Sequence, residues 1–276
     1  MPWHAQLHLD YQRRDNRTVL QHRHSGPLRI LKSLYPEGDS VCHNVVVHPP
    51  GGLVGGDLLD IHLRVGSGAH AMLGTPGATR FYATDTDSAT QQVSLQLDEG
   101  ARLEWLPLEA IAYPGCNARN LLQATLASGA EMMGWDVTAL GLALAGQPYT
   151  AGCFEQRLEL PGRWLEQARL DASDTRLLQS PLGLGGQRCL GTFWLATGTP
   201  LTRDRRALLL DAVRGALDCS ANGVRAAATC PNDHVLVVRA VAPVVEPLMG
   251  LLQRAWAALR PAAWGLAPVE PRIWKV

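Results

Sequence analysis

The sequence has no net charge, because 25 Lys and Arg residues balance 25 Asp and Glu residues among its 276. A chain without an overall basic field has no long-range attraction for nucleic acid or for an anionic membrane surface. We therefore expect neither a nucleic acid nor a membrane as a partner of this protein.

Cysteine motifs and long apolar runs are also missing. No two cysteines stand at C-x-x-C spacing, which weighs against a zinc ribbon or a thioredoxin-like redox site. The six cysteines are Cys42, Cys116, Cys153, Cys189, Cys219 and Cys230. No stretch approaches the ~20 apolar residues that a membrane span requires, and no signal peptide is visible near Met1. These absences predict a cytosolic (cytoplasmic) protein whose cysteines are reduced thiols.

Signatures of catalysis and of nucleotide binding are absent too. There is no G-x-S-x-G nucleophile elbow. A phosphate-binding loop needs Lys after its last glycine, whereas here Gly56 is followed by Asp57, whose charge would repel phosphate. No strand–turn–helix frame surrounds the glycines at residues 183–186, so they do not form a dinucleotide fingerprint. The residues alone therefore give no positive indication of an active site.

Turn-forming residues are plentiful, with 27 Gly and 18 Pro spread between short apolar segments. Leu7, Leu9 and Tyr11 alternate with polar residues, which is the period of a half-buried strand. Further strands are predicted for residues 18–20, 28–30, 41–47, 58–65, 69–73, 91–97, 102–106, 120–126, 155–160 and 234–241. The pattern predicts a mainly β fold, while no fixed-length repeat indicates a regular solenoid.

Two helices are predicted near the end of the chain. Residues 202–218 carry one apolar stripe, with Thr202 as a plausible N-cap. Residues 247–260 carry another, with Pro247 at the first helical position. No linker-like or low-complexity segment interrupts the chain, so residues 1–276 are expected to form a single domain.

The densest motif occupies residues 48–57, His-Pro-Pro-Gly-Gly-Leu-Val-Gly-Gly-Asp. Its four glycines and two prolines fix a tight backbone path. One interpretation is a shaped loop that presents Asp57 for function. The other is a sharp connection between strands in which Asp57 caps a turn, and the residues alone favour this second interpretation.

Eight of the nine histidines lie in the first seventy residues. Imidazole suits nickel, copper and zinc, and His22 and His24 share one face of a predicted strand because side chains two apart point the same way. No carboxylate or cysteine completes a recognisable ligand set, so scattered surface or core histidines are the favoured interpretation. His22 and His24 are only weak metal candidates.

Short motifs follow one another along nearly the whole chain. They are Gly-Pro-Leu at 26–28, Tyr-Pro-Glu-Gly at 35–38, the loop at 48–57, Thr-Pro-Gly-Ala-Thr-Arg-Phe-Tyr at 75–82, Leu-Glu-Trp-Leu-Pro at 103–107, Gly-Trp-Asp at 134–136 and Pro-Arg-Ile-Trp at 271–274. In this order they resemble the UreD (UreH) family of urease accessory proteins. Residues 108–110, Leu-Glu-Ala, depart from the Gln-Glu-Thr that usually follows in that family.

The resemblance implies a large coiled or superhelical β architecture with two α-helices near the C-terminus. It also implies a protein without catalytic activity that binds apo-urease, made of the structural subunits UreA, UreB and UreC, and recruits UreF and the nickel-carrying GTPase UreG. In that family the assembly promotes carbamylation of the urease active-site lysine by CO2 and insertion of nickel. No tightly bound cofactor is implied, only transient Ni²⁺.

A tunnel through the UreD-type subunit is the nickel route that the resemblance implies. Acidic residues matching Asp57, Asp136 and Glu166 are candidates for lining or supporting it, and Thr75 and Thr79 could supply neutral oxygens. A conduit must bind its ion strongly enough to admit it and weakly enough to release it. Lone carboxylates with water lower the electrostatic barrier to a dication, whereas a His and Cys cage would trap it.

Two other functions stay open at this point. A β-rich polysaccharide-active hydrolase or lyase would need clustered carboxylates with shifted pKa values in an open groove. A stand-alone nickel-binding protein would use the N-terminal histidines, His22 and His24 among them, to bind several Ni²⁺ ions tightly.

Overall fold

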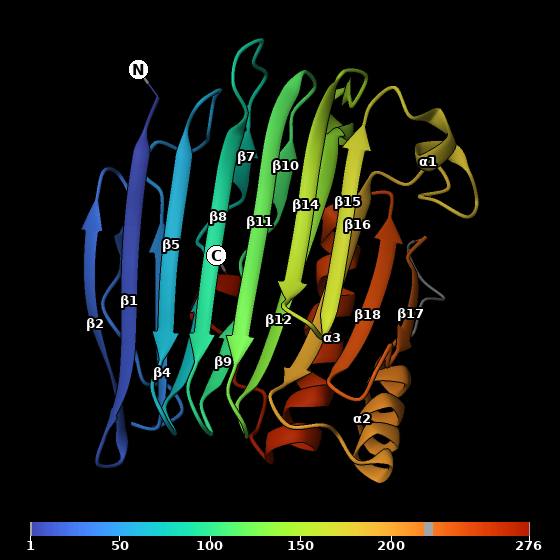
Figure 1. Cartoon of the computed structure of the whole chain (residues 1–276). Coiled ribbons are helices and arrows are strands. Elements are labelled where there is room, and N and C mark those ends of the chain that lie inside the picture. The colour runs from blue at the N-terminus through green and yellow to red at the C-terminus, as the bar shows by residue number, and fades with distance from the viewer. Residues whose placement is uncertain (1, 218–222, 276) are drawn as a thin grey trace.

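Two β-sheets lie face to face in the computed structural model, and helices cover the outer side of one of them (Figure 1). The structure describes residues 2–217 and 223–275, so Cys219 and the last residue of the predicted helix 202–218 lie outside the described residues. In this part of the chain no helix is both long enough and apolar enough to cross a bilayer.

The first sheet has seven strands and forms the front layer in Figure 1. In spatial order they are β15 (Trp164–Asp171), β14 (Gly152–Leu160), β11 (Cys116–Leu126), β8 (Ala89–Leu97), β5 (Leu58–Val65), β1 (His4–Arg14) and β2 (Arg17–Ser25). The second sheet follows the order β17 (Arg225–Thr229), β18 (Val235–Ala242), β16 (Cys189–Thr197), β12 (Glu131–Leu142), β9 (Arg102–Trp105), β6 (His70–Gly74), β4 (Val41–Val47) and β3 (Arg29–Ile30). Three short strands join it beside this path, namely β10 (Ala110–Ala112), β7 (Thr79–Phe81) and β13 (Gln147–Pro148).

The chain winds between the two sheets as a coil. β4 of the second sheet is followed by β5 of the first, β6 returns to the second and β8 to the first, and the alternation continues through β14. Each turn of the coil runs the same way, so β5, β8, β11 and β14 are parallel, as are β4, β6, β9 and β12. The strands β4, β6, β9 and β12 begin at residues 41, 70, 102 and 131, so the turns of the coil are of similar length, but they share no residue pattern that a search for repeats would find. The predicted coiled β fold is confirmed.

Apolar side chains from both sheets fill the space between the two layers. Leu7, Leu9 and Tyr11 of β1 all point inward and are buried, as their alternation predicts. The rings of Phe81 and Phe154 pack edge to face across this core, with their centroids 5.3 Å apart. Burying such a side chain is worth about 1.5–3 kcal/mol relative to leaving it in water. The polar residues that share this interior are therefore exceptions that need an explanation.

Helices α2 (Arg203–Ala216) and α3 (Val245–Trp264) confirm the two predicted helices. The Thr202 side chain accepts a hydrogen bond from the Arg205 N–H, so it is the N-cap of α2 as predicted. The prediction for α3 was wrong by two positions, because the helix begins at Val245 and Pro247 is its third residue. Both helices pack on the outer face of the second sheet. Shorter elements are α1 (Thr175–Gln179), which no sequence pattern predicted, and the 3₁₀ turns Ala143–Ala145 and Arg272–Lys275.

A buried ionic cluster fastens α3 to the strands beneath it. Arg260 of α3 is fully buried, and its guanidinium lies 3.2 Å from the Glu104 carboxylate of β9 and 2.6 Å from that of Glu37. His70 Nε2 lies 2.8 Å from Glu104, and His43 Nε2 lies 2.6 Å from Glu37. Each charge therefore has partners inside the protein, which offsets the cost of removing it from water.

The predicted strands all occur, but several real strands gave no alternating pattern. The most important are β12 and β16. Nearly all of their residues are buried, whichever face of the strand they point to. The first sheet covers one face of these strands and α3 packs on the other. A strand buried on both sides has no polar face, so the two-residue period that reveals half-buried strands is lost.

Candidate functional site

A cavity of about 220 Å³ opens between the two sheets. Its walls come from β5, β8 and β11 of the first sheet and from β4, β9, β10 and β12 of the second, with the loops 48–53 and 75–80 across one end. The loop 48–53 belongs to the Gly- and Pro-rich segment 48–57. Of the residues that line the cavity, Asp136 is the one carboxylate.

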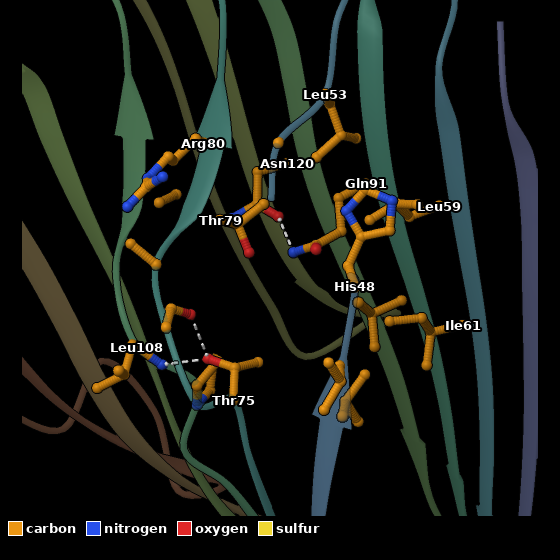
Figure 2. A pocket seen from close by; sticks show the side chains of 18 of the residues that line it. His48, Leu53, Leu59, Ile61, Thr75, Thr79, Arg80, Gln91, Leu108 and Asn120 are labelled. Atoms are coloured by element: carbon orange, nitrogen blue, oxygen red, sulfur yellow. Dashed lines mark hydrogen bonds between the residues drawn. The ribbon is translucent and has the colours of Figure 1, made fainter. Parts of the chain in front are cut away.

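Amide side chains lead from the cavity wall into the interior. Gln91 of β8, Asn120 of β11 and Gln156 of β14 are register partners on neighbouring strands, at inward-facing positions. The Gln91 amide donates to Asn120 Oδ1 at 3.1 Å, a bond drawn in Figure 2, and Asn120 Nδ2 donates to Asp136 Oδ2 at 2.9 Å. The first sheet thus supplies amides that face a carboxylate of the second sheet.

Asp136 sits in the middle of this polar interior. One oxygen, Oδ2, accepts from Asn120, and the other, Oδ1, is buried without a hydrogen-bond partner among the described residues. Burial raises the pKa of Asp136 to about 7, although the Gln156 amide opposes the shift, and the nearby charge of Glu166 adds to it. The carboxyl group can therefore exchange its proton near neutral pH.

Glu166 lies further along the same interior, where β15 faces β16 and β18. Its carboxylate accepts a hydrogen bond from Thr192 Oγ1 at 3.1 Å and forms an ion pair with Arg239. Thr192 is the register partner of Asp136 on β16, and Arg239 is the register partner of Thr192 on β18. We use the name polar row for the set of Gln91, Asn120, Gln156, Asp136, Thr192 and Glu166. It runs from the cavity to the half-exposed Arg239.

Asp57 is placed at the base of the loop 48–57 and does not line the cavity. Its Oδ1 accepts from the Trp3 N–H at 2.7 Å and its Oδ2 from the Val54 N–H at 2.9 Å. These are the contacts of a residue that closes a turn and ties the N-terminal strand to the loop. Gly56 has φ of +82°, a backbone conformation that glycine adopts without strain, so the tight path of this loop requires it.

Thr75 and Thr79 both line the cavity, on the loop that follows β6 and at the start of β7. Thr75 Oγ1 donates to the Gly77 carbonyl at 3.0 Å and accepts from the Leu108 N–H at 2.9 Å, as Figure 2 shows. Its hydroxyl therefore holds two loops together at the cavity wall. Thr79 is half-buried beside it.

His48 is a cavity residue that opens the motif 48–57, although no sequence pattern assigned a role to its side chain. By sequence it is one of many scattered histidines, yet its Nε2 is buried without a partner among the described residues. Burial lowers the pKa of His48, and the nearby Asp57 charge opposes that shift. The sequence does mark two of the amide residues. Gln91 and Asn120 occupy positions on the apolar side of their strands, where the alternating pattern predicts an apolar residue.

His22 and His24 do not line this cavity and lie on the edge strand β2. Their rings stack with centroids 6.3 Å apart, and both side chains are exposed. The Arg29 guanidinium lies 3.0 Å from His24 Nδ1, where its charge would oppose a cation. Within residues 2–217 and 223–275, no cluster of three or more His, Cys, Asp or Glu side chains has the geometry to hold a metal ion.

Comparison with known proteins decides the family. The family described as UreD urease accessory protein matches residues 4–275. This chain belongs to the UreD family. The urease accessory protein UreD of Albidiferax ferrireducens is 57% identical over 274 residues, which cover 99% of both chains. That of Polaromonas sp. strain JS666 is 54% identical over 276 residues, and that of Methylibium petroleiphilum is 47% identical over 295, each match covering 100% of both chains.

In this UreD-family chain, most of the motifs that carried the resemblance meet at the cavity. The segments 48–57, 75–82, 103–107 and 134–136 are far apart in the sequence, yet each supplies residues to the cavity wall. The two sheets bring them together because each segment follows or forms a strand on a successive turn of the coil. The cavity is therefore built largely from family motifs, whereas the motifs at 35–38 and 271–274 do not line it.

Proposed function

We propose that this chain is a urease maturation factor, a non-catalytic scaffold that binds apo-urease together with UreF and UreG. In this role it facilitates delivery of nickel and CO2 to the urease active site. Membership of the UreD family supports the urease part of the proposal, because the relatives are named urease accessory proteins. The partners are the urease subunits UreA, UreB and UreC with UreF and UreG, the location is cytoplasmic, and Ni²⁺ is bound only in transit.

The observation that carries the nickel part is the unpaired Oδ1 of Asp136 at the cavity wall. A buried carboxylate beside amide and hydroxyl oxygens attracts a dication, yet it has too few strong ligands to hold one permanently. The polar row then offers oxygen ligands from the cavity toward Glu166. An interior path of weak oxygen ligands is what a conduit requires.

The candidate residues contribute to this path in different ways. Asp136, Thr75 and Thr79 lie at the cavity itself. Glu166 is at the far end of the polar row, where Arg239 balances its charge and would have to give way to a passing ion. Asp57 supports the loop 48–57 through two backbone hydrogen bonds, so we assign it a supporting role beside the route.

Co-expression with the urease structural subunits and the other accessory proteins tests the proposal. We expect urease to contain little nickel and to show little activity when this chain is left out, and to recover both when it is present. Equal nickel content with and without the chain would refute the proposal. The purified chain alone should turn over no substrate.

Two substitutions separate the route from the scaffold. Asp136→Asn removes the carboxylate while keeping an acceptor for Asn120, so we expect urease to lose nickel while the complex still forms. Asp57→Ala should also lower the nickel content of urease while the complex still forms, here by loosening the loop 48–57. Normal maturation by Asp57→Ala would mean that the route does not need the support of Asp57. Normal maturation by Asp136→Asn would refute this nickel route while leaving the scaffold role intact.

The two alternative functions have their own tests. Polysaccharide hydrolysis requires a pair of carboxylates flanking the substrate, whereas Asp136 is alone among the residues that line the cavity. Release of reducing sugar by the purified chain would restore that alternative. Tight binding of several Ni²⁺ ions, lost on replacing His22 and His24, would favour a nickel store over the scaffold.

A further inference from the structure

The first sheet ends at β2, and the outer edge of this strand is open over most of its length. Figure 1 shows β2 at the left end of the front layer, with β1 as its neighbour in the sheet. Two hydrogen bonds close the beginning of the edge. The Thr18 N–H donates to the Asp39 carbonyl and Tyr35 Oη donates to the Thr18 carbonyl, each at 2.9 Å. After Thr18, no backbone hydrogen bond joins β2 to any described segment other than β1.

The register shows which peptide groups of β2 point outward. In an antiparallel pair, a residue directs its N–H and C=O to the same side, and successive residues alternate between the two sides. Thr18 directs both groups away from β1. The residues that follow it in the same orientation are Leu20, His22 and His24. Tyr11, the register partner of Leu20 on β1, agrees with this, because its carbonyl turns away from β2 and accepts from the Gly66 N–H at 2.7 Å. We use the name open edge for the outward peptide groups of residues 20–24.

The open edge lies in a locally positive part of a chain that has no net charge. Residues 13–32 contain six basic residues and one acidic residue, Asp15, which gives a net charge of +5 with the histidines neutral. The basic residues are Arg13, Arg14, Arg17, Arg23, Arg29 and Lys32, and all six are exposed. Within the described part of the chain, Arg17 alone among them forms an ion pair, with Asp39 at 3.6 Å. The positive charge around the open edge is therefore largely uncompensated.

We propose that β2 binds an extended, acidic segment of a partner protein in the urease maturation assembly, which joins the first sheet as a further strand beside residues 20–24. Peptide groups of the incoming strand supply the donors and acceptors that the open edge lacks. Acidic side chains of that strand meet the arginines around it. The inference rests on the proposed function, because it takes the partner from that assembly.

Charge and hydrogen bonding disfavour the other occupants of an open edge. A second copy of this chain would bring a second region of charge +5 against the first, and like charges on edge strands keep copies apart. A nucleic acid has the charge to bind here, but its phosphate oxygens accept hydrogen bonds without donating any. The outward carbonyl groups would then gain no partner. A peptide strand with carboxylates satisfies both requirements.

Hydrogen exchange, resolved to single residues, measures the open edge directly. The full chain is compared alone and in complex with apo-urease, UreF and UreG. Alone, the N–H groups of the open edge should exchange quickly, while those of Val19, Gln21 and Arg23, which face β1, should exchange slowly. In the complex, exchange at the open edge should slow at least about tenfold, because the new strand bonds these groups. Unchanged exchange there in an intact complex would overturn the inference and leave the scaffold role standing.

Two substitutions at His22 separate the peptide group from the side chain. Proline is tolerated on an edge strand where the missing N–H faces outward, so His22→Pro should keep the ladder with β1. It should weaken binding to the assembly at least about tenfold, since one hydrogen bond is lost and the ring obstructs the incoming strand. His22→Ala keeps the N–H and should bind as the wild type does. Equal affinities of His22→Pro and wild type, or equal losses in both variants, would overturn the inference. If circular dichroism shows that His22→Pro does not fold, the exchange of the wild-type complex decides.

The charge of the partner segment has its own test. Arg23→Glu should weaken binding about tenfold and reduce its dependence on salt, because Arg23 is exposed beside the open edge. Arg169→Glu makes the same change of charge at an exposed position on β15, the opposite edge of the sheet, and should bind as the wild type does. Equal losses in the two variants would mean that charge acts without involving β2.

Cross-linking identifies the occupant. A p-benzoylphenylalanine in place of Gln21, which is exposed on β2, should link to a segment of urease or of an accessory protein that has more acidic than basic residues. Links to a second copy of this chain or to a segment without acidic excess would overturn the inference. So would binding of a short DNA duplex that is lost in Arg23→Glu but kept in His22→Pro. Failure of the wild-type chain to form any complex would refute the proposed function together with this inference.

Discussion

Asp136 is the residue in which burial and function conflict most directly. Folding buries its carboxyl group with one oxygen unpaired, and this burial raises its pKa from the ordinary 3.8 to about 7. In the unfolded chain the same group ionises near pH 4. The folded state therefore binds a proton that the unfolded state has lost between these two pH values, and stability must change there.

The sign of that change gives the first prediction. Because the folded pKa of Asp136 is raised, its contribution to stability is fully present below pH 4 and is lost as the pH rises toward 7. The loss amounts to about 4 kcal/mol, at ~1.4 kcal/mol per pKa unit. Asp136→Asn cannot ionise, so urea unfolding at pH 8 should show it to be more stable than the wild type. The difference should vanish near pH 4, and a difference independent of pH would contradict the assignment.

At the scale of the element, β12 is the strand that positions Asp136. Neighbouring residues of this strand point to opposite sides, so Met132 and Asp136 face the first sheet while Met133 and Trp135 face the helices. Gly134 lies among them, opposite Trp194 of β16, with which it pairs in register. A Cβ atom at Gly134 would lie 2.6 Å from Cζ2 of that ring. The glycine is thus required for β12 to pack against the indole.

Gly134→Ala is therefore expected to destabilise the protein by about 1–3 kcal/mol, the usual cost of overpacking a core. Thermal or urea unfolding measures it. Gly250→Ala is the matched control, because its added Cβ meets nothing closer than 3.7 Å and Ala is favoured over Gly inside a helix. That variant should be as stable as the wild type or more so. Equal effects of the two substitutions would argue against close packing at Gly134.

The attachment of α3 to the strands gives a third prediction, at the same scale. Arg260→Met leaves Glu104 and Glu37 without their buried cation, and breaking such a pair costs about 3–5 kcal/mol. Arg119→Met, which breaks a half-exposed pair with Glu155, should cost at most about 1 kcal/mol. Urea unfolding of both variants at pH 7 checks the contrast. Similar small losses in the two would mean that the buried cluster adds little.

The pH dependence of that attachment follows from Glu37. Burial favours its neutral form, but hydrogen bonds from His43 and Arg260 outweigh this and hold its pKa below the ordinary value. A lowered pKa contributes stability above the ordinary Glu range, which is lost as the pH falls through the folded pKa. The difference between wild type and Arg260→Met should therefore shrink in acid.

At the scale of the whole molecule, two cores share their strands. Residues of β12 and β16 contribute alternately to the core between the sheets and to the core beneath α2 and α3. Neither core can open without disturbing strands that the other also uses. If the chain is a single domain, as expected, we predict that it unfolds in a single cooperative transition.

Leu9→Ala in the core between the sheets and Leu252→Ala in the core beneath the helices test this cooperativity. Each should lower the stability of the whole chain by about 2–5 kcal/mol, the cost of truncating a buried leucine. Unfolding followed by far-UV circular dichroism and by tryptophan fluorescence should coincide for both variants. Two separate transitions would mean that the helical layer unfolds on its own.

Local sequence determined what depends on neighbours along the chain. Alternation located strands such as β1 and β5, the apolar stripes located α2 and α3, and Thr202 marked the start of α2. The order of the motifs along the chain was enough to indicate the family, and Asp136, Thr75 and Thr79 proved to line one cavity.

Tertiary structure decided what depends on contacts between distant segments. β12 and β16 are buried on both faces, so no period in the sequence marks them. The unpaired Nε2 of His48 and Oδ1 of Asp136, and the hydrogen bonds that Asp57 accepts from the Trp3 and Val54 backbone, arise only when the coil stacks its turns. The physical reason is that propensity and periodicity act over a few residues, whereas burial, pKa and unpaired polar atoms are set by whichever strands the fold places opposite.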